Sequence, residues 1–153
     1  MVLTANTKEG ATCIALFSTT DLKTWKDLGP ILVGPAKGYE ARLWGGHPQG
    51  SLESANLSFH EGKWRLIVNC SIRNKGRGSW IWESEQLGGF RFEDARQFWP
   101  GAGCIENVME QGSKTLLAGL DAGRLKFGVV DWSQPKPEAH FVTMEELHSW
   151  QVH

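Results

Sequence analysis

The sequence repeats one arrangement of short apolar segments separated by turns. One group of four such segments opens with Glu53-Ser54-Ala55-Asn56-Leu57, and the next opens with Ile105-Glu106-Asn107-Val108. Glu53 and Glu106 lie 53 residues apart. Units of roughly 40–50 residues that each hold four short strands are typical of β-propeller blades. The sequence therefore predicts an all-β protein, a partial β-propeller.

The predicted propeller contains about two and a half to three four-stranded antiparallel blades. We expect one domain over residues 1–153, with these parts: a partial blade at 1–33, a loop at 34–52, a blade at 53–99, a blade at 101–143 and a C-terminal tail at 144–153. A β-sandwich is the alternative, because it also contains many short strands. A sandwich, however, does not require a carboxylate at the same point of successive units.

Turn residues between apolar runs define the expected strands. These strands cover residues 1–6, 12–18, 30–33, 53–59, 63–70, 79–84, 90–98, 104–109, 115–120, 125–132 and 140–143, and a short helix is expected over 144–150. Trp80 and Trp82 alternate along one strand and should share a buried face. Trp25, Trp64, Trp99 and Trp132 are also interpreted as structural. His60 and Glu61 fall in a hairpin turn, so we expect them to be exposed.

Composition and charge exclude several classes of protein. The formal net charge is -1 and no basic block is present, which argues against a nucleic-acid partner. No apolar run approaches the ~20 residues of a membrane span. The first residues, Met1–Asn6, lack the features of a signal peptide, so a cytoplasmic location is expected.

The same composition gives little sign of a cofactor or a metal. The three cysteines form no C-x-x-C pair, so we expect buried free thiols and no metal site. No phosphate-binding loop or nucleotide motif stands out, and no cofactor is predicted. The 18 glycines and 8 tryptophans fit a turn-rich β protein that handles sugars.

Three short motifs stand out along the chain. The segment Ile14–Trp25 contains a strand that ends in Ser18, followed by an Asp-Leu turn and a Trp. The segment Glu53–Leu66 begins with Glu and a small residue and continues into a Gly-Lys hairpin, and Gly103–Glu106 opens the following unit. In this order the motifs are similar to a recurrent blade signature, to a blade that begins with Glu, and to a His-Ala-Pro-Glu type motif of the β-fructosidase and arabinanase superfamily of glycoside hydrolases (families 32, 43 and 68). The resemblance implies a truncated five-bladed propeller.

The resemblance also implies roles for two carboxylates. Glu53 stands at the position of the general acid, and Glu106 at that of a second glutamate that lines the same pocket. Glycoside hydrolysis uses two carboxylates about 5 Å apart for retention, or roughly 6.5–9.5 Å apart for inversion. Glu53 and Glu106 are therefore the candidate catalytic residues, and we expect both to point into a central funnel.

Polar and aromatic side chains near Glu53 form a predicted sugar-contact surface. Tryptophan stacks on pyranose faces, while histidine, amide and guanidinium groups bond to hydroxyls. The candidate substrate-binding residues are Trp44, His47, Gln49, Asn56 and Arg73. A glycine-rich connector around Trp44 and a solvated turn at Arg73 are the alternative interpretations.

Two function classes follow from these residues. One is a glycoside hydrolase-like protein that acts on or binds a carbohydrate as an oligomer. The other is a noncatalytic carbohydrate-binding or scaffold protein, because the family's first-blade carboxylate and its Arg-Asp-Pro type segment have no counterpart in this chain. An open row of blades is expected of either a fragment or an obligate homo-oligomer, and we favour a head-to-tail homodimer that completes a ring of about six blades.

Overall fold

The computed structural model describes residues 1–35, 52–72 and 76–150. Within these residues the strands form three antiparallel sheets, so the all-β prediction is confirmed. Sheet 1 contains β1 (Val2–Asn6), β2 (Thr12–Ser18) and β3 (Lys26–Val33). Sheet 2 contains β4 (Leu52–His60), β5 (Lys63–Ile72), β6 (Gly76–Ser84) and β7 (Arg96–Trp99). Sheet 3 contains β8 (Gly103–Gln111), β9 (Lys114–Asp121), β10 (Arg124–Asp131) and β11 (His140–Phe141).

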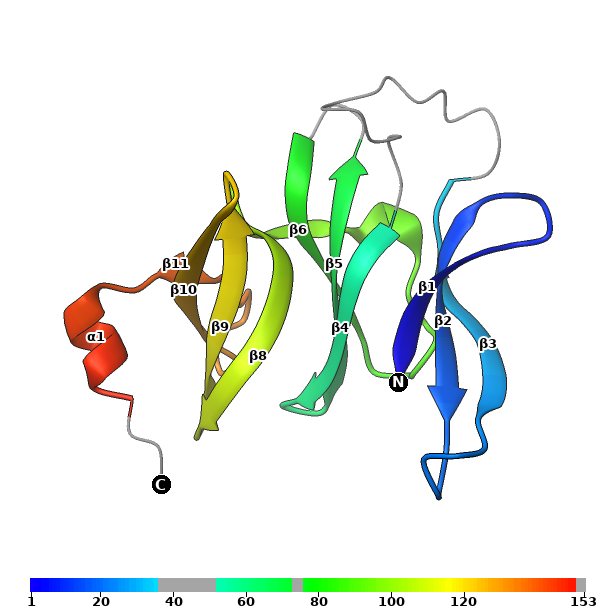
Figure 1. Ribbon diagram of the computed structural model, residues 1–153, viewed down its shortest axis with the longest axis horizontal. Coiled ribbons are helices and arrows are strands. Elements are labelled where there is room, and N and C mark those ends of the chain that lie inside the picture. Colours follow the sequence, from blue (N-terminus) through cyan, green and yellow to red (C-terminus); the bar gives the residue numbers. More distant parts are fainter. Residues whose placement is uncertain (36–51, 73–75, 151–153) are drawn as a thin grey trace.

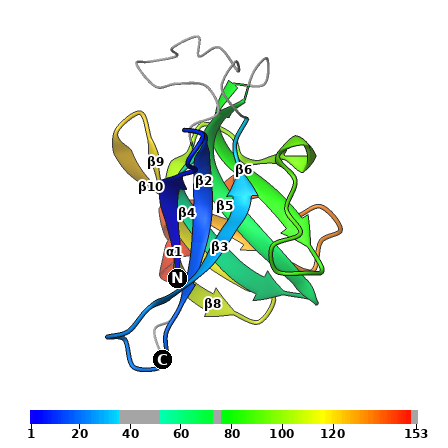
Figure 2. The same ribbon diagram turned by 90° about the vertical axis from the view of Figure 1, so that its right-hand side faces the viewer.

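Each strand pairs with its neighbour in the sequence, and the three sheets follow the chain order. Figure 1 shows the sheets side by side, with sheet 2 between the other two. Figure 2, which looks along this row from sheet 1, shows the strands of successive sheets crossing at an angle. The short helix α1 (Met144–His148) follows sheet 3. No helix in the described part of the chain has the length and apolarity needed to cross a membrane.

Tight turns fix the register of the hairpins. In β4–β5 the residue pair His60–Lys63 closes the ladder, and Glu61 and Gly62 form the loop with φ angles of 49° and 74°. Two consecutive residues with positive φ match the twist of a two-residue hairpin. The turn therefore holds β4 and β5 in one alignment and sets which side chains face each neighbouring sheet.

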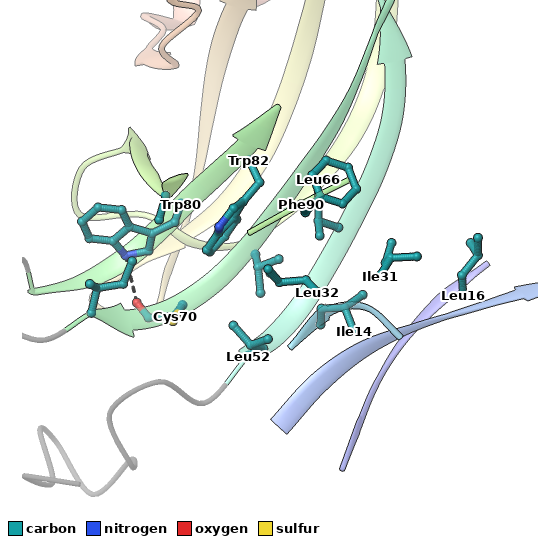
Figure 3. Close-up of a cluster of buried hydrophobic side chains, with 13 residues drawn as sticks. Ile14, Leu16, Ile31, Leu32, Leu52, Leu66, Cys70, Trp80, Trp82 and Phe90 are labelled. Carbon is teal, nitrogen blue, oxygen red and sulfur yellow. Dashed lines mark hydrogen bonds between the residues drawn. The ribbon is translucent and has the colours of Figure 1, made fainter. Parts of the chain in front are cut away.

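The first hydrophobic core lies between sheets 1 and 2. Figure 3 shows its side chains converging from both sheets, among them Ile14, Leu32, Leu66, Trp80 and Trp82. The indole Nε1 of Trp80 donates to the carbonyl of Cys70 at 3.0 Å, and that of Trp82 donates to the carbonyl of Phe92 at 3.3 Å. Both indoles thus combine apolar burial with a satisfied donor. The prediction that they share a core-facing side is confirmed.

The second core lies between sheets 2 and 3. Its buried members are Ile67, Ile81, Phe98, Trp99, Ala102, Ile105, Leu117, Val130, Trp132 and Ala139. Because sheet 2 contributes to both cores, β5 is buried on both faces from Arg65 to Ile72. A strand covered on both sides is expected to be rich in apolar residues, and five of the eight residues from Arg65 to Ile72 are apolar.

Four expectations about local structure are wrong. The strand expected over 90–98 is a turn and a 3-10 helix (Phe92–Asp94) followed by the short β7, since Phe90 and Ala95 both enter the first core instead of alternating across a sheet. The strand expected over 140–143 ends at Phe141, because Thr143 caps α1 through a reciprocal capping box with Glu146. The helix ends at His148 rather than at residue 150. The strand expected over 30–33 begins at Lys26.

His60 is half-buried, although its place beside a turn predicted exposure. Its ring stacks on Trp132, with ring centroids 4.8 Å apart and an interplanar angle of 10°. Its Nε2 lies 3.7 Å from Glu110 and has no hydrogen-bond partner. The alternation along β4 turns His60 toward sheet 3, which covers it. Glu61, in the loop itself, is exposed as predicted.

Acidification is expected to destabilise the fold through His60. Burial lowers the pKa of this imidazole below its ordinary value of 6.5, and Arg65 adds to that effect while Glu110 and Glu61 oppose it. The unfolded chain therefore takes up a proton first, and the free energy of unfolding decreases as the pH falls from about 6.5 toward the folded pKa. The urea midpoint should drop more on acidification in the wild type than in His60→Phe, which keeps the stacking without titrating. Parallel pH profiles for the two proteins would contradict this assignment.

Candidate functional site

The strands β4 and β8 begin with the same irregularity. In β4 the register is interrupted between Glu53 and Asn56, and in β8 it is interrupted between Gly103 and Glu106. Each interruption is a bulge that contains a non-glycine residue with positive φ. Ser54 has a φ of 50° in β4, and Cys104 has a φ of 52° in β8. Backbone held in this region by a residue with a side chain costs on the order of 1 kcal/mol or more, and within a strand it marks a candidate functional site.

The two bulges also contact each other. The hydroxyl of Ser54 donates to the Sγ of Cys104 at 3.4 Å. The two residues come from strands that begin different sheets and are 50 positions apart in the chain. This contact fixes the beginnings of β4 and β8 side by side, and it defines the candidate site.

The bulges correct the alignment of the two units. The last paired residue before the bulge is Glu53 in β4 and Gly103 in β8, and the first paired residue after it is Asn56 in β4 and Glu106 in β8. The two units are therefore offset by 50 residues, as Ser54 and Cys104 are, and not by the 53 residues that separate the two glutamates. The prediction that Glu53 and Glu106 occupy the same point of successive units is therefore wrong.

Sheet 3 lies between the faces that carry the two glutamates. Glu53 pairs with Asn69, two residues from Ile67 in the second core, and so lies on the face of sheet 2 that is turned toward sheet 3. Glu106 follows the buried Ile105 and lies on the opposite face of its sheet, where it is exposed. The expectation that both point into one central funnel stays a prediction. Asn56, which pairs with Ile67, is half-buried on the same face as Glu53.

Glu53 is half-buried and lies close enough to Cys70 to affect its titration. Burial raises the pKa of the Cys70 thiol to about 12, and the negative charge of Glu53 adds to the rise. Cys70 is therefore protonated at neutral pH and is a structural residue of the first core rather than a nucleophile.

An open hollow of about 530 Å³ lies beside the bulge of β8. Its lining residues are Asn69, Gly78, Gly101, Ala102, Gly103, Cys104, Leu120, Asp121, Ala122 and Gly123. Asn69 comes from β5 and pairs directly with Glu53, so the hollow adjoins the candidate acid. No motif in the sequence marks Asn69 or Asp121 as a site residue.

Four of the predicted substrate-binding residues, Trp44, His47, Gln49 and Arg73, lie outside the described residues. Within the described ranges, no group of three or more His, Cys, Asp or Glu side chains could hold a metal ion. The functional groups of the described site residues are carboxylates, carboxamides, a hydroxyl and a thiol.

Comparison with known proteins gives no assignment. No known protein family matches this chain, and no curated protein matches it either. The resemblance to glycoside hydrolases therefore remains a hypothesis drawn from short motifs.

Proposed function

We propose that this chain is a carbohydrate-binding protein whose sheets are blades of a β-propeller. The observation that carries the proposal is the pair of bulged strand starts, β4 and β8, held together by Ser54 and Cys104 beside an open hollow. In a propeller the first strand of each blade lines the central axis, and ligands bind around that axis. Polar side chains gathered at such strand starts are well placed to meet a sugar.

The packing of the sheets supports the blade interpretation. β4 lies against β1 and β2 of the preceding sheet, and β8 lies against β4, β5 and β6 of its own preceding sheet. Each new sheet thus covers its predecessor in the same manner. Repetition of one such step around an axis is how blades build a propeller.

The polar groups at the site suit hydroxyl ligands. A carboxylate such as Glu53 accepts hydrogen bonds from sugar hydroxyls, and the amide of Asn56 both donates and accepts. Bonds from hydroxyls to a charged carboxylate contribute about 1.5–3 kcal/mol each. A few such groups around a hollow are enough for selective, moderate affinity.

Calorimetric titration with arabinose, xylose, fructose and their oligosaccharides tests the proposal. The wild type should bind at least one of these sugars, and Glu53→Gln should bind it roughly 10-fold or more weakly, since a charged acceptor is lost. Glu85→Gln, at an exposed turn after β6, is the matched control and should bind normally. If the wild type binds none of the sugars, the proposal is wrong.

Glycoside hydrolysis is a second candidate function. The position of Glu53 favours it, because its strand pairs it with Asn69 at the wall of the hollow, and carboxyl groups carry out glycoside hydrolysis. Glu106 of the same chain lies on the face of sheet 3 that is turned away from sheet 2. The second carboxylate would therefore come from another copy of the chain. Chromogenic arabinosides, fructosides and xylosides test this directly: turnover by the wild type that is lost in Glu53→Gln supports it, and sugar binding without turnover leaves only the binding function.

We propose further that the working form is a head-to-tail homodimer. The outward face of sheet 1 exposes Leu3 and Val33, and the outward face of sheet 3 exposes Leu120 and Leu125. Pairing these two faces between copies would continue the packing step that joins the sheets within one chain. The dimer also buries leucines that are costly to leave in water.

Light scattering coupled to size exclusion tests the dimer. The wild type should elute at twice the 17.0 kDa of one chain. Leu125→Glu, at a side chain 61% exposed, should shift it to the monomer, whereas Leu22→Glu, at a turn position 78% exposed, should not. A monodisperse wild-type monomer counts against the proposal.

A further inference from the structure

The hollow beside β8 lies where segments from two sheets meet. Its walls are the residues that enter β8 (Gly101–Cys104), the β9–β10 hairpin (Leu120–Gly123), and Asn69 and Gly78 of sheet 2. Its volume of about 530 Å³ falls within the range of small-molecule sites, which is roughly 300–1,000 Å³. The hollow therefore has room for a small ligand.

A glycine keeps this space open. A Cβ atom added at Gly103 would lie 2.9 Å from Oδ1 and 3.2 Å from Cγ of Asn69. In the neighbouring unit the matching position holds Glu53, whose side chain is half-buried. Sheet 3 thus lacks a side chain at the point where sheet 2 has a large polar one. The missing side chain leaves Asn69 at the wall of the hollow.

Asn69 is a buried amide with unused bonding capacity. The residue is only 5% exposed, and none of the described residues forms a hydrogen bond with its side chain. A carboxamide has two donor hydrogens and an acceptor oxygen, and Asn69 presents its own at the wall of the hollow. A ligand hydroxyl in the hollow could both accept from Nδ2 and donate to Oδ1. Asn69 is thus a group that a ligand would satisfy.

Asp121 supplies a second polar group on another wall. It is half-buried, and its Oδ1 would lie 3.8 Å from a Cβ added at Gly101. None of the described residues that line the hollow is a lysine, an arginine or a histidine. The carboxylate of Asp121 offers acceptors to hydroxyl hydrogens. Ala102 and Leu120 provide a small apolar surface for C–H groups.

From the buried amide, the carboxylate and the glycine-lined space, we infer that this hollow binds one end of a neutral polyhydroxylated ligand, through hydrogen bonds to Asn69 and Asp121. The inference rests on the proposed carbohydrate-binding function and gives it a specific subsite. Asn69 and Asp121 contact the ligand directly, while Gly103 provides the room.

Cys104 provides a built-in reporter of occupancy. It lines the hollow and is half-buried, whereas the other two cysteines are buried. A bound sugar should therefore slow the reaction of Cys104 with N-ethylmaleimide, measured by mass spectrometry of the labelled peptide. This readout reports the position of the ligand independently of its affinity.

The experiment compares Asn69→Ala, Asp121→Asn and the control Glu145→Gln, an exposed residue of α1, with the wild type. The probes are arabinose, xylose, fructose and their disaccharides, titrated by calorimetry. We expect binding at least 10-fold weaker in the first two variants, unchanged binding in the control, and slower labelling of wild-type Cys104 at saturating sugar. Urea midpoints of all four proteins identify any variant that is weakened by misfolding, and Asp121→Asn keeps the shape of the side chain.

Three results would overturn the inference. If a sugar binds, but both site variants bind normally and Cys104 labels at the same rate, the hollow is not the subsite and the proposed function stands. If ethanolamine protects Cys104 and the sugars do not, the hollow takes a cation rather than a neutral ligand. If the wild type binds no sugar at all, the proposed function fails and the inference fails with it.

Discussion

Replacing Trp132 with alanine is expected to lower the free energy of unfolding by about 3–5 kcal/mol. The indole is 1% exposed and lies at the centre of the second core. Its ring stacks on His60 at 4.8 Å and on Phe98 at 5.8 Å, with interplanar angles of 10° and 4°. The guanidinium carbon of Arg65 lies 4.9 Å from the ring centroid. Removing the indole therefore takes a shared surface away from three neighbours at once.

The substitution also leaves a buried polar group without its partner. Nε1 of Trp132 donates to the hydroxyl of Thr115 at 2.7 Å, and Thr115 is fully buried. Urea denaturation followed by fluorescence or circular dichroism measures the loss. Trp25→Ala, at the tryptophan that is 40% exposed, is the control and should change the midpoint little. Equal destabilisation by the two substitutions would show that Trp132 is not a central packing residue.

Replacing Glu83 with alanine is expected to lower the free energy of unfolding by about 3 kcal/mol, because it removes the partly buried counter-ion of a buried arginine. Oε1 of Glu83 lies 2.9 Å from Nε of Arg65, and its Oε2 lies 3.2 Å from Nη2 of Arg96. Arg65 is buried and also donates from Nη1 to the carbonyl of His60 at 2.7 Å. Without Glu83 the Arg65 cation stays buried with one backbone partner and no counter-ion.

An exposed ion pair in the same chain provides the control. Arg91 and Asp94 approach to 2.9 Å, and both side chains are more than half exposed to solvent. Asp94→Ala should shift the urea midpoint only slightly, since both charges stay hydrated when the pair is broken. High salt should likewise have little effect on the difference between Glu83→Ala and the wild type, because buried pairs are screened weakly. A Glu83→Ala midpoint equal to that of Asp94→Ala would mean that Arg65 finds another partner.

Turns and alternation in the sequence predict most strands of this fold. The run Lys63–Cys70 between a Glu-Gly turn and a polar loop has the pattern of a buried strand, and it is one. The aromatic residues of the segment Phe90–Phe98 predict one strand, and this prediction is wrong. Phe90 and Phe98 enter different cores. His60 was also mispredicted, since a hairpin position says nothing about a neighbouring sheet that covers it. Contacts between sheets are set by the fold and are not visible in local patterns.

The site was harder to predict than the strands. Ser54 and Cys104 have positive φ without being glycine, so the sequence gives no signal for the bulges that set the register of Glu53 and Glu106. Asn69 stands within an apolar run that reads as core, and Asp121 stands in a turn where aspartate is common. Their proximity arises only when sheets 2 and 3 pack together. A polar residue within an otherwise apolar run was the one available hint.

The placement of sheet 2 between sheets 1 and 3 has a consequence for how the native state fluctuates. Each of the two cores joins consecutive sheets, so the stability is distributed along a row, much as in repeat proteins. Detaching sheet 1 or sheet 3 disrupts the packing of one core, whereas unfolding sheet 2 disrupts the packing of both. Amide hydrogens of β5 should therefore exchange with solvent more slowly than those of β1 or β11. The protein should open from its two ends inward, with its middle strands released only on global unfolding.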